Sequence, residues 1–233
     1  TPCGTLFPYT TLFRSGRSTS GGQGSNDRKA RSGTADSGRS ISSLFCWQPI
    51  GYPVNETAYQ YLSIEKQGHL NLVSFNRPEH LNALNMALME EICHCARTLS
   101  KDDQCRVVVF TGKGQHFSSG LDLSDGDFLD RFSSASRLMK VRHLKLGPEM
   151  IRAIHEIDQI TIAAINGAAM GGGACIASAC DFRIGASDCS VGYPEVNLAM
   201  NLSWVSLPLL VHLIGPVKAK QMVILAERVD AET

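Results

Sequence analysis

The sequence has no excess of charge of either sign: lysine and arginine together number 22, and so do aspartate and glutamate. A chain without net charge has no overall attraction for nucleic acid or for an anionic membrane surface. We therefore expect no nucleic-acid partner. Any anionic ligand must be held by local features of a binding site.

Long hydrophobic runs are also missing. The longest apolar stretches, such as Val205 to Leu210, are far shorter than the ~20 residues that a bilayer-spanning helix needs. We therefore expect no membrane partner. The length of 233 residues and the apolar content of 43% are enough for one sizeable core, but not for two ordinary domains.

Clusters of metal-binding side chains are scarce, although the chain has eight cysteines. Cys93-His94-Cys95 is the one tight group. Consecutive residues on a helix point in different directions, and no second cysteine pair with zinc spacing follows. We therefore expect no metal, and we expect buried, reduced thiols of the kind found in cytoplasmic proteins.

We place a tail at residues 1–58, and its first 45 or so residues contain little that a folded core could use. Hardly an apolar residue occurs between Arg14 and Arg39, and serine, glycine, arginine and threonine dominate. This composition predicts a disordered tail, because it buries too little surface to offset the lost chain entropy. An organellar presequence is an alternative, but the glycines and the missing apolar face argue against an amphipathic targeting helix. The run from Pro8 to Ser15 also resembles a translated sequencing adaptor, which would make the tail an artefact.

From Tyr61 onward, apolar residues recur at the spacing of regular secondary structure. Alternation at Leu62 and Ile64, followed by an apolar run over 70–75, predicts a hairpin with its turn at Gln67-Gly68. The following segment has apolar residues on one helical face, and it predicts a helix that is capped by Asn85 and ends near 99.

The next segments alternate between strand and helix. The β-branched run 106–111 predicts a strand that is covered on both faces of its sheet. Apolar residues at helical spacing over 150–157 predict a helix, and 160–165 predicts a second buried strand. This β-α-β-α order indicates an α/β fold with a largely parallel sheet covered by helices.

A small-residue segment follows the second strand: Asn166 to Met170, then Gly171, Gly172 and Gly173, then a helical pattern. Glycine permits positive φ and lets a ligand approach the backbone, while a helix start supplies free N–H groups and a positive dipole end. The turn therefore fits an anion or a developing oxyanion. It matches neither the dinucleotide-binding fingerprint nor the P-loop. Close packing of helix and strand is the alternative role of these glycines.

A second glycine turn, Ser118-Ser119-Gly120-Leu121-Asp122, follows the earlier strand. Enolate chemistry needs two N–H donors that converge on one oxygen, and two turns at the ends of neighbouring parallel strands can supply them. We predict that the amides of Leu121 and Gly172 are this pair.

Glu195 follows Pro194 among apolar neighbours. Burial there would raise its pKa toward neutrality, which suits a carboxylate that carries protons. The alternative is an acidic residue that stabilises the N-terminus of a helix through the helix dipole.

Four motifs carry a family resemblance. They are Asn76-Arg77-Pro78 with Leu81-Asn82-Ala83-Leu84, Ser119-Gly120-Leu121-Asp122-Leu123, Ala168-Ala169-Met170-Gly171-Gly172-Gly173 with Ala179-Cys180-Asp181, and Pro194-Glu195. Through them, residues 59–233 resemble the crotonase superfamily, also called the enoyl-CoA hydratase/isomerase family. The resemblance implies a spiral of ββα units, an acyl-CoA thioester as ligand, no further cofactor, and a homotrimer or hexamer.

The resemblance also implies site residues. Catalysis is assigned to Glu195, Gly172 and Leu121. Contacts to the substrate are assigned to Leu121, Asp122, Leu123, Ser124, Gly172, Arg77 and Ala83. The expected enolate oxygen would rest between the amides of Leu121 and Gly172.

Two departures from the family pattern bear on the reaction. Family hydratases carry a second glutamate where this chain has Cys175, so the resemblance favours isomerisation of a 3-enoyl-CoA to a 2-enoyl-CoA by Glu195 alone. A 2-enoyl-CoA hydratase, a thioester hydrolase or decarboxylase, and a non-catalytic acyl-CoA-binding protein remain alternatives. Trp204 either walls the acyl site or packs in the core. The sequence also stops at Thr233, where the family continues into helices that close the acyl pocket.

We predict that the segment before about Val54 is dispensable, because its composition offers neither a core nor a motif. A chain that starts at Tyr59 should unfold at the same temperature and with the same cooperativity as the 233-residue chain. Thermal unfolding followed by circular dichroism checks this, and loss of a cooperative transition in the shorter chain would contradict it.

Overall fold

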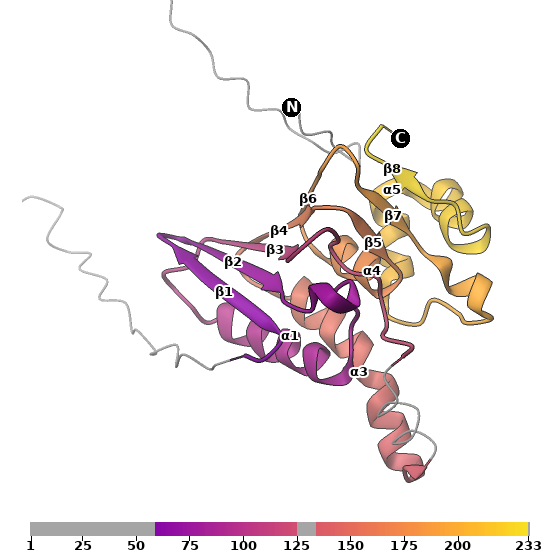
Figure 1. Cartoon of the computed structure of the whole chain (residues 1–233), viewed down its shortest axis with the longest axis horizontal. Coiled ribbons are helices and arrows are strands. Elements are labelled where there is room, and N and C mark those ends of the chain that lie inside the picture. Colours follow the sequence, from indigo (N-terminus) through magenta and orange to yellow (C-terminus); the bar gives the residue numbers. More distant parts are fainter. Residues whose placement is uncertain (1–58, 125–133, 233) are drawn as a thin grey trace, which may run out of the picture. The chain divides into compact units, whose positions relative to one another are not determined.

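The computed structural model describes residues 59–124 and 134–232 of the chain (Figure 1). The prediction for the tail, residues 1–58, lies outside these residues. The described elements are, in order, β1 (Leu62–Gln67), β2 (Leu70–Phe75), the 3-10 helix η2 (Pro78–His80), α1 (Met86–Leu99), β3 (Val107–Gly112), α3 (Arg137–His155), β4 (Ile160–Ile165), β5 (Ala168–Met170), α4 (Gly172–Ala179), β6 (Phe182–Gly185), β7 (Ser190–Gly192), the 3-10 helix η3 (Pro194–Leu198), α5 (Ser206–Ile224) and β8 (Val229–Asp230).

The larger sheet has the strand order β1-β2-β3-β4-β6. Strands β1 and β2 form the predicted antiparallel hairpin, with its turn at Gly68 (φ 61°). All later pairs in this sheet, β2 with β3, β3 with β4 and β4 with β6, are parallel. The predicted α/β fold with a largely parallel sheet is therefore confirmed.

One face of the central strands of this sheet is buried. Val108 and Phe110 of β3 are completely inaccessible, and Phe75 of β2 stacks on Phe110 with ring centroids 6.4 Å apart. These side chains share a single core with the apolar faces of α1 and α3, which lie side by side against the sheet (Figure 1). Buried aromatic side chains of this size contribute strongly to stability through the apolar surface they remove from water.

The second face of the sheet differs from the prediction. Val107 and Val109 of β3 are only half-buried, and Ile160 at the start of β4 is half exposed. A run of β-branched residues predicted cover on both faces, but in the described residues helices cover only one.

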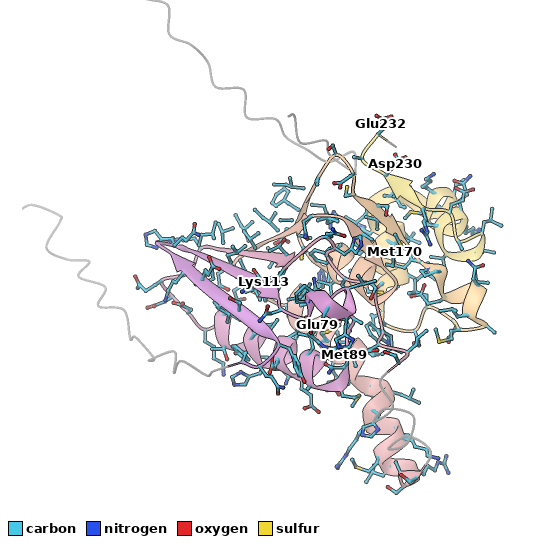
Figure 2. The ribbon with its side chains drawn as sticks, in the orientation of Figure 1. Glu79, Met89, Lys113, Met170, Asp230 and Glu232 are labelled. Atoms are coloured by element: carbon cyan, nitrogen blue, oxygen red, sulfur yellow. The ribbon has the colours of Figure 1, made fainter. Side chains whose placement is uncertain are left out.

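Helix α1 has the predicted start. Its N-cap is Asn85, whose side-chain oxygen accepts a hydrogen bond from the amide of Leu88 at 2.9 Å, which satisfies one of the free N–H groups of the first turn. Met89, labelled in Figure 2, is buried on the core face of this helix. Cys93 and Cys95 are also buried, whereas His94 faces outward and its Nδ1 lies 2.9 Å from the hydroxyl of Tyr59.

Helix α3 is longer than the predicted segment 150–157. It begins at Arg137, and its first half stands away from the rest of the domain (Figures 1 and 2), with Leu138 and Leu144 both 60% exposed. Gly147 and Pro148 lie at the boundary between this exposed half and the buried half. A Gly-Pro pair is typical of a helix end, so the sequence did not predict the first half of this helix.

Helix α5 is long and apolar enough to cross a membrane by length and composition alone. However, Gly215 has non-helical backbone angles (φ 77°, ψ 164°) and Pro216 follows it, so two shorter helices meet there. Neither piece reaches the ~20 residues that a membrane span needs. The sequence analysis considered only uninterrupted apolar runs and did not identify this helix.

A buried ion pair links two loops at the carboxyl end of the sheet. Arg77, at the end of the loop after β2, donates through Nη1 to Oδ2 of Asp122 at 2.9 Å and to the carbonyl of Ala83 at 2.5 Å. Both charged side chains are almost inaccessible. Burial alone would raise the pKa of Asp122, but hydrogen bonds from Ser124 and Arg77 outweigh it and hold this pKa below its usual value.

We predict that Asp122→Ala lowers the free energy of unfolding by about 3–5 kcal/mol, because it leaves the charge of Arg77 buried without a partner. The exposed pair of Lys218 and Glu227 is the control: Lys218→Ala should cost no more than about 1 kcal/mol. Urea unfolding measures both. Equal effects of the two variants would contradict the prediction.

The folded-state pKa of Asp122 is lowered, so this carboxylate should stabilise the fold above its unfolded-state pKa. The stabilisation should be lost as the pH falls through the folded-state pKa.

Candidate active site

The first glycine turn is held by backbone pairing on both sides of Leu121. The carbonyl of Gly120 accepts a hydrogen bond from the amide of Leu84 at 2.7 Å, and the amide of Asp122 donates to the carbonyl of Leu84 at 3.1 Å. The Gly120 amide itself is bonded to Oγ of Ser118 at 3.2 Å. For the Leu121 amide, which lies between these bonds, no acceptor occurs among the residues that the structure describes.

The second glycine turn begins helix α4. Gly171 is the N-cap with φ 51° and ψ −115°, a conformation that strongly favours glycine. Its amide donates to the carbonyl of Gly192 at 2.9 Å, and its carbonyl accepts from the amide of Cys175 at 2.9 Å. The next amide, that of Gly172, has no acceptor in the described part of the chain, as expected for the first turn of a helix.

The two turns touch each other. Ser118 pairs in parallel with Ala169 of β5, and its carbonyl accepts from the amide of Met170 at 2.9 Å. Gly120 has φ 95°, and a methyl group placed on it would lie 2.8 Å from the Met170 carbonyl oxygen and 3.2 Å from the Gly172 nitrogen. Only glycine fits at this approach. The predicted donor residues, Leu121 and Gly172, are thereby brought onto adjoining turns.

Glu195 lies against the same turns. It occupies the first turn of η3, and a methyl group placed on Gly171 would lie 3.2 Å from Oε1 of Glu195. Its Oε2 is buried and has no hydrogen-bond partner within the described residues. Burial of the carboxyl group raises the pKa of Glu195 above its ordinary value. A carboxylate in this state is suited to accept and return a proton.

Cys175 occupies the position of the second carboxylate of family hydratases. It is completely inaccessible on α4, and burial raises the pKa of its thiol to about 12. The thiol is therefore neutral at ordinary pH. Glu195 is the titratable group with a raised pKa that has a free carboxylate oxygen at these turns.

The other predicted substrate contacts fall into two groups. Arg77, Ala83 and Asp122 are buried and bonded to one another, so they brace the first turn. Leu123 and Ser124 are exposed just beyond it, and Leu123 is 54% accessible. The assignment of these five residues to ligand binding stays a prediction.

A buried tyrosine that the sequence analysis did not consider supports Glu195. The hydroxyl of Tyr193 lies 2.6 Å from Oγ of Ser178 and 3.3 Å from the carbonyl oxygen of Ala174, both on α4. This contact fixes the chain two residues before Glu195 to the helix that provides the Gly172 amide. No local pattern indicates it, because Tyr193 and Ser178 are separated by 15 residues.

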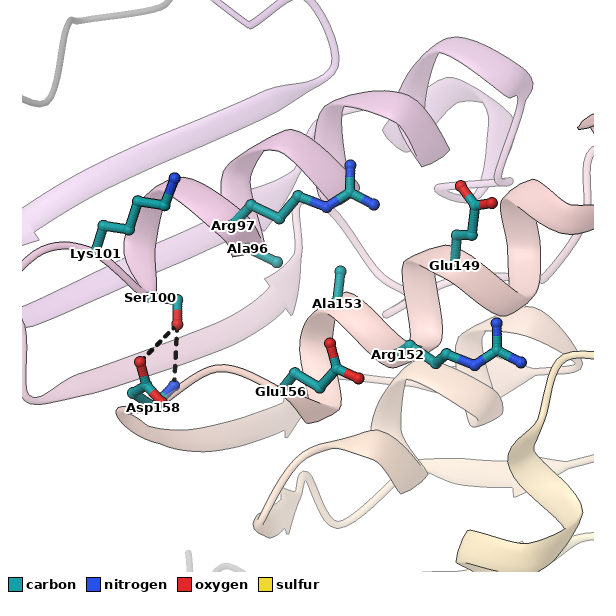
Figure 3. Close-up of a pocket in the computed structure, with 9 residues that line it drawn as sticks. All are labelled: Ala96, Arg97, Ser100, Lys101, Glu149, Arg152, Ala153, Glu156 and Asp158. Atoms are coloured by element: carbon teal, nitrogen blue, oxygen red, sulfur yellow. Dashed lines mark hydrogen bonds between the residues drawn. The ribbon is translucent and has the colours of Figure 1, made fainter.

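A separate concavity of about 480 Å³ lies between α1 and α3 (Figure 3). Oγ of Ser100 donates to Asp158 at 3.0 Å within it. Its lining residues are Ala96, Arg97, Ser100, Lys101, Glu149, Arg152, Ala153, Glu156 and Asp158. Three basic and three acidic side chains leave it without a charge preference, and none of the residues discussed above lines it.

Known proteins are similar to this chain over most of its length. The sequence profile of the Enoyl-CoA hydratase/isomerase family matches residues 65–233. A crotonyl-CoA hydratase of Syntrophomonas wolfei is 34% identical over 75% of this chain and 65% of its own length. The mitochondrial Delta(3,5)-Delta(2,4)-dienoyl-CoA isomerase of Rattus norvegicus is 33% identical over 76% of this chain and 57% of its own length.

Solved structures give the same result. The enoyl-CoA hydratase of Bacillus anthracis superposes with a TM-score of 0.67 at 30% identity, covering 74% of this chain and 66% of that protein. The chain thus spans between 57% and 66% of the length of these relatives. With the profile match over most of its length and with the shared fold, the chain belongs to the enoyl-CoA hydratase/isomerase family.

Proposed function

We propose that the protein is an acyl-CoA enzyme that isomerises a 3-enoyl-CoA to the 2-enoyl-CoA, with Glu195 as the single acid and base. The observation that carries this proposal is the placing, on adjoining turns, of one buried carboxylate oxygen and two amides that have no hydrogen-bond partner among residues 59–124 and 134–232. Coenzyme A is part of the substrate, and the reaction needs no further cofactor.

In the proposed reaction, the thioester carbonyl oxygen accepts hydrogen bonds from the amides of Leu121 and Gly172. Glu195 removes a proton from carbon 2, and the electron pair of that C–H bond moves into the thioester, forming an enolate. The double bond shifts as Glu195 returns the proton to carbon 4. The two N–H groups stabilise the negative charge where it develops, which lowers the barrier rather than only improving binding.

The environment of Cys175 favours this reaction over hydration. Water addition in the family uses a second carboxylate, and the corresponding thiol here is neutral and completely buried. A single proton carrier is enough for a 1,3 proton shift, because the proton removed from carbon 2 is the one delivered to carbon 4.

Hydration of a 2-enoyl-CoA is the second candidate. It is favoured by the 34% identity to a crotonyl-CoA hydratase, whereas the 33% identity to a dienoyl-CoA isomerase favours isomerisation. Separate assays with a 3-enoyl-CoA and a 2-enoyl-CoA distinguish the two. A protein that hydrates the 2-enoyl thioester and leaves the 3-enoyl thioester unchanged would refute the isomerase proposal.

We predict that Glu195→Gln lowers the rate of isomerisation by about 10²-fold to 10⁴-fold, because the amide keeps the shape but cannot carry the proton. Steady-state kinetics with a 3-enoyl-CoA measure the effect. Cys175→Ala is the matched control: it lies on α4 at the same site, and its neutral thiol takes no part in the proposed reaction. The control should stay close to wild type. A similar loss in both variants would indicate damage to the fold instead of loss of the base.

We also predict that kcat/KM falls on the acid side of its pH profile at a higher pH than an exposed glutamate would give. The base is the ionised form of Glu195, and burial raises the pKa of this group. Activity should therefore decline, as the pH is lowered, with a midpoint above the ~4.3 of an exposed glutamate. A midpoint at or below that value would show that the base is another group or that the carboxylate is solvated in the working enzyme.

A further inference from the structure

Trp204 is held between two helices by a pair of glycines. A methyl group placed on Gly172, in the first turn of α4, would lie 2.4 Å from Cζ3 of Trp204. A methyl group placed on Gly147, in α3, would lie 2.3 Å from Cε2 and 2.4 Å from Nε1 of the same indole. The ring therefore fills the space between these backbones, and neither helix has room for a side chain at that point.

The loop that carries the indole is strained. Val205, the next residue, has φ 64°, a left-handed conformation that β-branched residues rarely adopt. Ser206 is completely buried, and its Oγ donates to the carbonyl of Trp204 at 3.4 Å as α5 begins. Strain of this kind persists only where the surrounding packing over-determines the conformation, and it often accompanies a function.

The position of the indole relates it to the reacting group. In the proposed reaction, the thioester carbonyl oxygen binds the amide of Gly172. The indole contacts the same residue on its Cα side, together with the fully buried Leu84, whose Cδ1 would lie 2.8 Å from a methyl group on Gly172. Next to Leu121 in the chain, Asp122 is paired with Arg77, and both side chains are buried. Leu84 and Trp204 thus form the apolar border of the oxyanion turn.

We propose that Trp204 is a specificity-determining residue, whose indole closes the site beside Gly172 and restricts the acyl group to short chains. This inference rests on the proposed acyl-CoA function. A longer acyl chain would have to displace the indole ring from its position between α3 and α4. The indole is bounded by backbone atoms on both sides, so that displacement requires movement of a helix.

The first experiment measures binding, so that it does not depend on which reaction occurs. Calorimetry with saturated short-chain and long-chain acyl-CoA gives the ratio of the two Kd values. In Trp204→Ala this ratio should shift in favour of the long chain by at least about 10-fold, the smallest effect expected for one methylene group in a hydrophobic pocket. Trp204→Phe should give a smaller shift. Phe110→Leu, which shortens a buried aromatic residue in β3, is the control and should leave the ratio unchanged.

A second experiment tests the packing itself. Gly147→Ala should lower the melting temperature of the wild-type protein, because the added methyl overlaps the indole. In the Trp204→Ala background the same change should be neutral or stabilising, since alanine favours a helix over glycine. If Gly147→Ala destabilises both backgrounds equally, the indole does not lie between Gly147 and Gly172, and the inference fails.

The outcomes separate this inference from the proposed function. An unchanged Kd ratio in folded Trp204→Ala overturns the role of Trp204, even if the wild type isomerises 3-enoyl-CoA. A shifted ratio in a protein that isomerises nothing supports Trp204 as a specificity residue and overturns the isomerase proposal. If the wild type binds neither thioester, both proposals fail.

Discussion

The close approach of two backbone turns is the constraint on which the site depends. Gly120 follows β3 and Gly172 begins α4, and a methyl group on Gly120 would come within 3.2 Å of the Gly172 nitrogen. The parallel pairing of β3 with β4 sets the two turns at the same end of the sheet. Because no side chain intervenes, two amides from distant parts of the chain can face one ligand atom.

The polar side chains around these turns differ in their hydrogen bonding. Arg77 and Asp122 form a buried pair that is completed by backbone and side-chain hydrogen bonds, so both charges have partners. In contrast, Oε2 of Glu195 is buried and without a partner in the described residues. A buried polar group without a partner costs about 1–3 kcal/mol.

The identity of one buried side chain determines the electrostatics of this site. A carboxylate at position 175 would raise the pKa of Glu195 through repulsion of like charges, and the two groups would titrate as a pair. With the neutral thiol of Cys175, burial is the main cause of the raised pKa of Glu195. A raised pKa that is caused by burial fits a proton carrier that works alone.

The sequence alone determined the elements that depend on local periodicity and local chemistry. The hairpin of β1 and β2, the Asn85 cap of α1 and the strand β4 follow from alternation, capping and an apolar run, and each was predicted within a residue or two. The resemblance to the enoyl-CoA hydratase/isomerase family, which the profile match confirms, also lies in short motifs that can be read along the chain.

Only the tertiary structure decided which distant residues meet. The short strand β5, the exposed first half of α3 and the seat of Trp204 between Gly147 and Gly172 have no local signal. The strand β5 and the position of Trp204 depend on contacts between segments that are far apart in the sequence, whereas Gly147 and Pro148 concealed the first half of α3. A glycine whose missing side chain makes room for a distant indole looks, in the sequence, like any other glycine in a turn or a helix. The physical reason is steric. The space beside such a glycine is filled by a side chain from a distant segment, so the local sequence cannot show it.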